Sequence, residues 1–282
     1  IGYVPRSRKA ARAKISFTVD SLEDTSTLTL NAGLICNGAG QNTNYIFSIP
    51  EDITVPVTNG VAEFSEIQIF EGTYVTQSFT VDTSLGNQKY ILDNSFIDTS
   101  TIKVKVFPSE ASSSSVTYQQ IDNIVGVTST ASSYLLQEIE DERYELIFGD
   151  NVIGKKLSNN NFIDVTYIVT DGRDGNGASE FSFVGNITNQ DGAAIDASLV
   201  SLITTDEKSR DGDEIESISS IKYYAPRIYS SQYRAVTASD YESVLAYIYP
   251  NVESVTAYGG EEMNPPRYGK VFISVKPRNG DF

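Results

Sequence analysis

The chain has 282 residues, a formal net charge of −16 and 40% hydrophobic residues, enough for one large or two ordinary globular domains with real cores. It contains no histidine and one cysteine, Cys36, which excludes Ser-His-Asp chemistry, His-ligated zinc, intrachain disulfides and cysteine-cluster metal sites. The acidic balance argues against nucleic acid as a general partner, and no apolar run approaches the roughly 20 residues that cross a bilayer. We therefore expect no cofactor, no metal, no nucleic-acid partner and no membrane partner.

Charge is distributed unevenly at the start of the chain. Residues 1–14 contain five basic side chains and no acid, whereas residues 15–88 contain nine acids and no Lys or Arg. This pattern predicts a basic helical lead-in over 1–14, with Ala10, Ala11 and Ala13 packed inward and the charges facing an acidic neighbour, which could be the next subunit. A membrane or RNA contact is the alternative. The start has no apolar h-region, so we expect no signal peptide. Because the chain lacks an initiator Met and stops just after a predicted strand, we expect a fragment of a longer protein.

The middle of the chain has the alternating pattern of β-strands. Apolar and polar residues alternate over 15–19, 75–81 and 102–106, and a polar turn at Asp141–Arg143 predicts a hairpin. Asn, Gly, Asp and Ser fill the gaps between these runs, as expected for turns. We predict an antiparallel β-rich, sandwich-like domain over residues 15–185.

From residue 186 the pattern changes to helices and short strands. Thr237, with Asp240 three residues later, forms an acidic capping box that predicts a helix start. The predicted elements, in chain order, are a helix over 197–205 capped by Asp196, an acidic loop over 205–214, a helix from 215 that ends before Pro226, a helix from 238, and strands over 252–258 and 269–276. We predict a mixed β and α+β protein whose second part, a smaller helix-on-sheet domain over residues 186–282, is truncated at its C-terminus.

Three groups of segments resemble one protein family. The series APR, a polar spacer, RAVTxxDYE, an apolar helix and PxVxxVxAxGG occupies residues 225–260. A second match, FGDNVIGKKL, lies at 148–157 before the strand FIDVTYIVT at 162–170, and a third, GYVPRSRKAARA, lies at 2–13. Taken along the chain from residue 2 to residue 260, the three groups have the order found in the baseplate J-like family of contractile-tail proteins, and they are similar to that family. Residues 20–130 carry no such motif.

The resemblance implies a structural virion protein and no enzyme. It implies a baseplate wedge subunit of a contractile phage tail, made in the host cytoplasm and located in the tail baseplate of the virion. It also implies self-association, as a dimer or ring contact, and binding to other baseplate wedge proteins. The mechanism would then be mechanical, through interface rearrangement between rigid domains when the tail contracts.

The tyrosine-rich segment at 223–258 supplies the candidate structural and interface residues. Tyr has a large apolar ring and a polar tip, which suits both cores and interfaces. We expect Tyr229 and Tyr233, in the link between two helices, to be interface residues. Arg227 and Arg234 flank this link, and either arginine could bind the carboxylate of Asp240 or Glu242 through two parallel hydrogen bonds. The complete candidate set is Arg227, Tyr229, Tyr233, Arg234, Thr237, Asp240 and Tyr241.

Two other function classes remain open at this point. A carbohydrate- or receptor-binding β module would use tyrosine-rich exposed patches, although the absence of Trp weighs against it. A carboxylate-only glycan hydrolase would need two carboxyls facing a sugar-sized cleft, with Glu138/Glu140 or Glu261/Glu262 as examples of such pairs. DGRDGNG at 171–177 places Arg173 at the third position of a calcium-loop template, which favours an ordinary glycine-rich turn.

Overall fold

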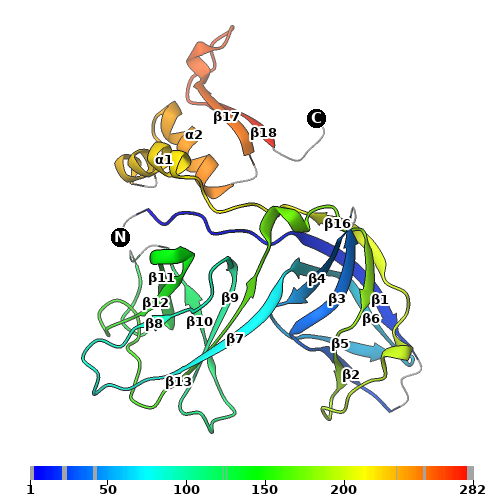
Figure 1. The fold of residues 1–282 in the computed structure, drawn as a ribbon. Helices are drawn as coiled ribbons and strands as arrows, with labels where there is room; N and C mark the ends of the chain where they lie inside the picture. The colour runs from blue at the N-terminus through cyan, green and yellow to red at the C-terminus, as the bar shows by residue number, and fades with distance from the viewer. Residues whose placement is uncertain are drawn as a thin grey trace. The chain divides into compact units, whose positions relative to one another are not determined.

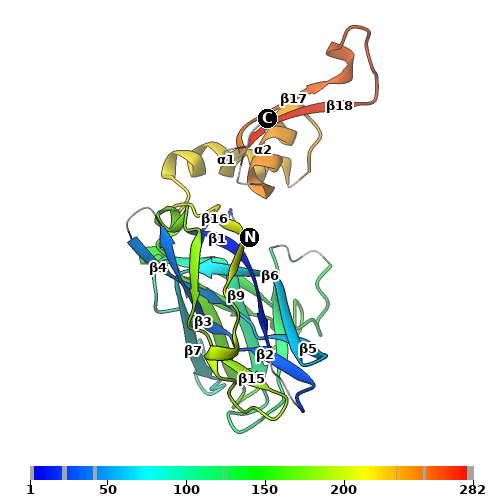
Figure 2. The same cartoon turned by 90° about the vertical axis from the view of Figure 1, so that its right-hand side faces the viewer.

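The computed structural model describes residues 3–20, 24–40, 43–122, 124, 126–232, 234–249 and 252–277 (Figures 1 and 2). The chain divides into two compact units. Ser7–Ile215 forms one, which we call the β unit; Ile1–Arg6 and Glu216–Phe282 form the other, the α+β unit. Within the described residues, no helix combines the length and apolarity needed to cross a membrane.

The first sheet of the β unit has nine strands in the order β14-β3-β4-β6-β5-β2-β15, with β1 paired to both β6 and β16. Its strands are β1 (Arg12–Val19), β2 (Thr27–Leu30), β3 (Gly33–Gly40), β4 (Thr43–Ile49), β5 (Ile53–Thr58), β6 (Val61–Glu71), β14 (Glu180–Phe183), β15 (Ile187–Asn189) and β16 (Thr204–Arg210). Alternate residues of β1 point inward, so that Ile15, Phe17 and Val19 join Phe47 and Phe64 in one buried core.

The second sheet has seven strands in the order β7-β13-β9-β10-β11-β12-β8. They are β7 (Thr73–Thr80), β8 (Tyr90–Ile91), β9 (Ile97–Phe107), β10 (Val116–Gln120), β11 (Ser133–Glu138), β12 (Tyr144–Phe148) and β13 (Phe162–Val169). All its neighbours pair antiparallel except β10 and β11, which are parallel. Its separate core contains three fully buried tyrosines, Tyr134, Tyr144 and Tyr167. The predicted hairpin is the β11–β12 pair, and the β-rich antiparallel fold class is confirmed.

The predicted helical lead-in over residues 1–14 is wrong. Residues 12–19 are β1, and Lys9 forms an isolated bridge with Asp213. The period-two pattern of β1 extends backwards, because Ala11 and Ala13 are buried while Arg12 and Lys14 are only half-buried. The predicted acidic neighbour lies within the same unit.

Ion pairs to that neighbour run along the basic segment. Arg8 contacts Glu214 at 2.9 Å, and Lys14 contacts Glu207 at 2.8 Å. The hydrogen bond and charge of Glu207 raise the pKa of Lys14. Both acids belong to the region that was expected to be a solvated loop.

The boundary between the two parts lies later in the chain than the predicted 185/186. The helix expected over 197–205 is a short 3₁₀ helix, Ala197–Leu199, in which Asp196 accepts from Ser198 N. The acidic loop expected over 205–214 contains β16 instead. Both β15 and β16 pair with strands near the start of the chain, and this long-range pairing has no local sequence signal.

The α+β unit contains α1 (Ile218–Ser231), α2 (Ala238–Ile248) and the antiparallel hairpin β17 (Val252–Gly259) and β18 (Val271–Pro277). α1 was predicted to end before Pro226 but continues through it. A proline in a helix interior removes one hydrogen bond. Ile228, the buried residue of this helix, lies after the proline, so packing offsets that loss.

The chain passes from the first sheet to the second at a buried carboxylate. β6 ends at Glu71, and Gly72 follows with a φ of 126°. Glu71 is 2% exposed, and its Oε2 accepts from Thr170 Oγ1 at 2.5 Å and from Asp171 N at 3.2 Å. Burial, together with the nearby charges of Asp171 and Asp174, raises its pKa to about 7.

The elevated pKa of Glu71 makes a pH-dependent contribution to stability. A carboxyl whose pKa is raised in the folded state stabilises it below the unfolded pKa, and this contribution is lost as pH rises through about 7. Glu71→Gln should therefore unfold at a pH-independent temperature over pH 5–8.5, whereas the wild type loses up to about 3 kcal/mol across this range. Calorimetry at several pH values measures the unfolding temperature of both proteins. Glu63→Gln, at an exposed position on the same strand, is the control and should keep the pH dependence of the wild type. A wild type with a flat profile would contradict it.

Candidate functional site

The α1–α2 junction carries the residues that the sequence singled out. Thr237 Oγ1 accepts from Asp240 N at 3.2 Å, and Asp240 Oδ2 accepts from Thr237 N at 2.8 Å. The predicted capping box is therefore confirmed. These hydrogen bonds lower the pKa of Asp240. The box fixes where α2 begins.

The first turns of α2 are also tied to the hairpin. Glu242 Oε1 accepts from Ala257 N at 3.0 Å, so that an acid of the RAVTASDYE motif joins α2 to β17. Ser243, the buried residue of the helix, lies next to it, while Tyr241 is half-buried. The acids of the motif thus have defined structural roles.

The predicted bidentate arginine pair is wrong. Arg227 donates to Tyr223 O at 2.7 Å, and its guanidinium lies 3.7 Å from the centre of the Tyr223 ring. Arg234 donates to Gln232 Oε1 at 2.6 Å. The carboxylates expected to bind them accept backbone N–H groups instead, at the helix cap and at β17. Capping is a local interaction, so it prevails over a longer-range ion pair on an exposed surface.

The predicted interface tyrosines have different positions. Tyr229 lies on α1 rather than in the link and is 81% exposed. Tyr233 lies outside the described residues. Tyr223 and Tyr224 contact each other edge to face, with ring centroids 5.0 Å apart. The role of Tyr229 in an interface stays a prediction.

The α+β unit exposes many large apolar side chains. Among its described residues, the buried apolar ones are Ile228, Val252 and Ala257. The exposed ones are Ile218, Tyr223, Tyr229, Val236, Ile248, Tyr249, Tyr268, Val271, Ile273 and Val275. The sequence predicted strands here but not this exposure. β17 packs next to α2 and contributes buried residues, whereas β18 contributes no buried apolar residue. Which strand faces the helix depends on the tertiary packing and not on the local sequence pattern.

Charge separates the two units as well. Residues 1–6 and 216–282 contain eight basic and seven acidic side chains, whereas residues 7–215 contain thirteen basic and thirty acidic ones. The net negative charge of the chain therefore belongs entirely to the β unit. A nearly neutral surface with exposed apolar side chains is suited to protein contacts, because neither desolvation of charge nor like-charge repulsion opposes association.

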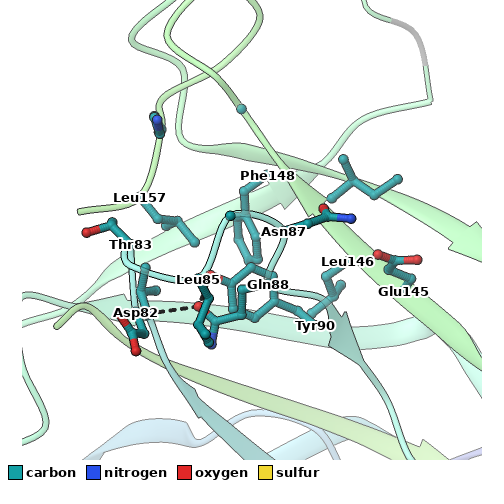
Figure 3. Close-up of a pocket in the computed structure, with 15 residues that line it drawn as sticks. Asp82, Thr83, Leu85, Asn87, Gln88, Tyr90, Glu145, Leu146, Phe148 and Leu157 are labelled. Carbon is teal, nitrogen blue, oxygen red and sulfur yellow. Dashed lines mark hydrogen bonds between the residues drawn. The ribbon is translucent and has the colours of Figure 1, made fainter. Parts of the chain in front are cut away.

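A pocket of about 370 Å³ lies in the β unit between the segment 81–90, the end of β12 and residues 156–157 (Figure 3). Much of its polar lining is already bonded within the protein. Gln88 Oε1 accepts from Asp82 N at 2.9 Å and from Tyr90 Oη at 3.1 Å, and Glu145 pairs with Lys89 at 3.3 Å. The carboxylate pairs considered for a hydrolase do not line it.

Within the described part of the chain, no group of three or more acids or Cys is arranged to hold a metal ion. The DGRDGNG segment forms a short 3₁₀ helix, Gly172–Gly175, with Arg173 bound to Asp213 at 2.6 Å. This is the turn that its sequence predicted.

Comparison with known proteins supports the family resemblance. Residues 237–282 match the family described as baseplate structural protein gp6, C-terminal domain I. Over 306 aligned positions the chain is 24% identical to the baseplate wedge protein gp6 of Enterobacteria phage T4, which covers 99% of this chain. This chain resembles phage T4 gp6 along almost its whole length. The resemblance predicted from the motifs is thereby confirmed.

The chain spans less than half of gp6, since the alignment covers 43% of that protein. A chain in the cryo-EM structure of the anti-feeding prophage baseplate is also similar. It is 15% identical, with 90% of this chain and 45% of that chain covered and a TM-score of 0.30. That TM-score is too low to support a conclusion about the fold.

Removing the capping box should lower the stability of the fold more than removing Arg234. Thr237→Ala should destabilise the α+β unit by about 1 kcal/mol, because Asp240 N loses its side-chain acceptor at the start of α2. Arg234→Met should change stability by less than about 0.5 kcal/mol, since its partner Gln232 is exposed. Thermal unfolding followed by circular dichroism compares the two, and equal losses would show that this assignment is wrong.

Proposed function

We propose that the chain is a structural, non-enzymatic subunit of the baseplate wedge in a contractile phage tail. It acts through self-association and through contacts with other baseplate proteins, and it resides in the tail baseplate of the virion. The resemblance to gp6 supports a location in the baseplate, and the exposed apolar side chains of the α+β unit support a role in binding other subunits during assembly. Among the described residues of this unit, the ten exposed large apolar side chains named above outnumber the three buried apolar residues, so most of them take no part in its core.

The two units suit a mechanical role. The chain passes between them twice, at residues 6/7 and 215/216. The β unit has two extensive buried cores, whereas in the α+β unit a capping box starts α2 and the Glu242–Ala257 hydrogen bond joins α2 to β17. Rearrangement at interfaces between such bodies is a known route for large structural transitions. We infer that contraction uses interfaces of this kind.

Self-association is tested by sedimentation velocity over a range of protein and salt concentrations. We expect a concentration-dependent increase in mass. Tyr229→Ser, at an exposed position, should weaken the self-association without changing the melting temperature, because aromatic anchors carry much of the binding energy of an interface. A monomer at every concentration would remove self-association from the proposal.

The location is tested separately. Gold-labelled antibodies raised against the β unit should mark the baseplate end of purified virions, and labelling of heads or tail sheath would contradict the assignment. Neither outcome depends on whether the isolated chain self-associates.

A further inference from the structure

The two segments that join the units pair with each other as antiparallel strands do. Lys9 N donates to Asp213 O at 2.9 Å, and Asp213 N donates to Lys9 O at 3.1 Å. Closer to the N-terminus, Glu216 N donates to Arg6 O at 3.0 Å. Three residues back on one segment correspond to three residues forward on the other, so both pairs share one register. We call residues 6–9 and 213–216 the linking ribbon.

The β unit anchors its end of the linking ribbon. Ser7 is 8% exposed, and its Oγ lies 2.9 Å from Thr99 Oγ1 and accepts from Thr99 N at 3.2 Å, which ties the ribbon to β9. Arg8 pairs with Glu214, the residue opposite it in this register, at 2.9 Å. The Arg8 guanidinium also lies 4.4 Å from the centre of the Phe96 ring. The anchoring therefore reaches Ser7, where the β unit begins.

One buried carboxylate anchors the other end. Glu216 is 7% exposed and accepts from Tyr3 Oη, which lies 2.7 Å from Oε2 and 2.8 Å from Oε1. It also accepts from Arg6 N at 3.1 Å and from Ser220 Oγ at 2.5 Å, and Arg6 Nε lies 3.8 Å from it. Burial and the hydrogen bond to Glu216 raise the pKa of Tyr3, so its hydroxyl remains a donor. Glu216 thus binds the N-terminal segment to the first turn of α1.

The boundary between the units falls between these two anchors, at 6/7 and 215/216. Residues 7, 8, 214 and 215 lie outside the strands and helices. Hinges are commonly a few residues at the ends of elements that absorb changes in φ and ψ. Two neighbouring connections constrain such a hinge more than one does, because rotation about the line through both is the motion that keeps the strands together.

We propose that the linking ribbon is a two-stranded hinge, about which the α+β unit bends relative to the β unit while twisting between them is restricted. The ion pairs Arg6–Glu216 and Arg8–Glu214 each lie within a single unit, so bending at the boundary breaks neither of them. This inference goes beyond the proposed function. It concerns a single chain, so its tests are independent of self-association.

Two independent flexible linkers are the alternative. Flexible linkers are rich in Gly and Ser, whereas the linking ribbon contains three basic side chains, three acidic ones and no Gly. The basic side chains lie on one strand and the acidic ones on the other, which favours pairing. The hydrogen bonds at Lys9 and Arg6 agree with the paired form.

Hydrogen exchange of the unmodified chain distinguishes the hinge from independent linkers. The amide protons of Lys9, Asp213 and Glu216 should exchange at least about a hundredfold more slowly than in an unfolded peptide, because each is bonded across the ribbon. Nuclear magnetic resonance or mass spectrometry at single-residue resolution measures these rates. Exchange as fast as in an unfolded peptide would overturn the proposal.

Distances between spin labels test the motion itself. Lys222→Cys on α1 and Glu63→Cys on β6 place a label at an exposed position on each unit, and the buried Cys36 stays unlabelled. The distance distribution from pulsed electron paramagnetic resonance should be broader than that of Glu63→Cys with Val116→Cys, a pair within the β unit. Dilution with unlabelled chain excludes distances between copies. Equal widths would show a rigid connection and overturn the hinge.

The matched variants Lys9→Pro and Lys9→Ala test the pairing of the ribbon. Both remove the side-chain charge, but only proline removes the N–H that donates to Asp213 O. In the chain labelled on both units, Lys9→Pro should widen the distribution about twofold, whereas Lys9→Ala should leave it unchanged. Equal widths in the two variants would overturn the proposal. Circular dichroism checks that both fold, and if the proline variant does not, the exchange rates and the width for the unmodified ribbon still decide.

Discussion

Two-sided pairing of β1 holds the β unit together. One edge of β1 pairs with β6 and the other with β16, so the first and last strands of the unit lie side by side. The ion pairs Arg8–Glu214 and Lys14–Glu207 follow this pairing and join the basic start of the chain to its acidic stretch. Contacts between such distant segments carry a large loop-closure cost, which the shared core must offset.

Buried carboxylates join the two sheets within this frame. Asp98 of β9 accepts from Ala10 N at 2.9 Å, which ties the lead into β1 to the second sheet. Its other oxygen accepts from Ser100 N and Ser100 Oγ at 3.0 and 2.7 Å. Glu71, at the end of β6, accepts from Thr170 Oγ1 and Asp171 N, and its burial raises its pKa. Two buried acids thus tie segments of the first sheet to segments that follow or belong to the second.

The two units meet opposite physical requirements. The β unit combines large cores with a strongly negative surface, which favours solubility and opposes non-specific association. The α+β unit has little core, almost no net charge and many exposed apolar side chains. The segment 150–156, between β12 and β13, is a local exception in the β unit, because Val152, Lys155 and Lys156 are exposed there in a unit dominated by acids. Surfaces suited to association are therefore confined to a few places.

The sequence by itself determined the features that depend on neighbouring residues. Alternation over 15–19 and 102–106 identified strands, and Thr237 with Asp240 identified a helix cap, because side-chain periodicity and capping act over a few residues. The motifs also led to the gp6 resemblance.

Only the tertiary structure decided which strands pair, where the units divide and which side chains stay exposed. The sequence of residues 1–14 predicts a helix because alanines and basic residues favour one locally, yet Arg12–Lys14 pair with β6 and β16 as part of β1. Arg227 and Arg234 do not pair with Asp240 or Glu242, because these carboxylates accept hydrogen bonds from backbone N–H groups instead. The pocket of Figure 3 is lined by segments about sixty residues apart in the sequence, which the pairing of β8 with β12 brings together. Local chemistry specified the elements, and long-range hydrogen bonding and burial decided how they combine.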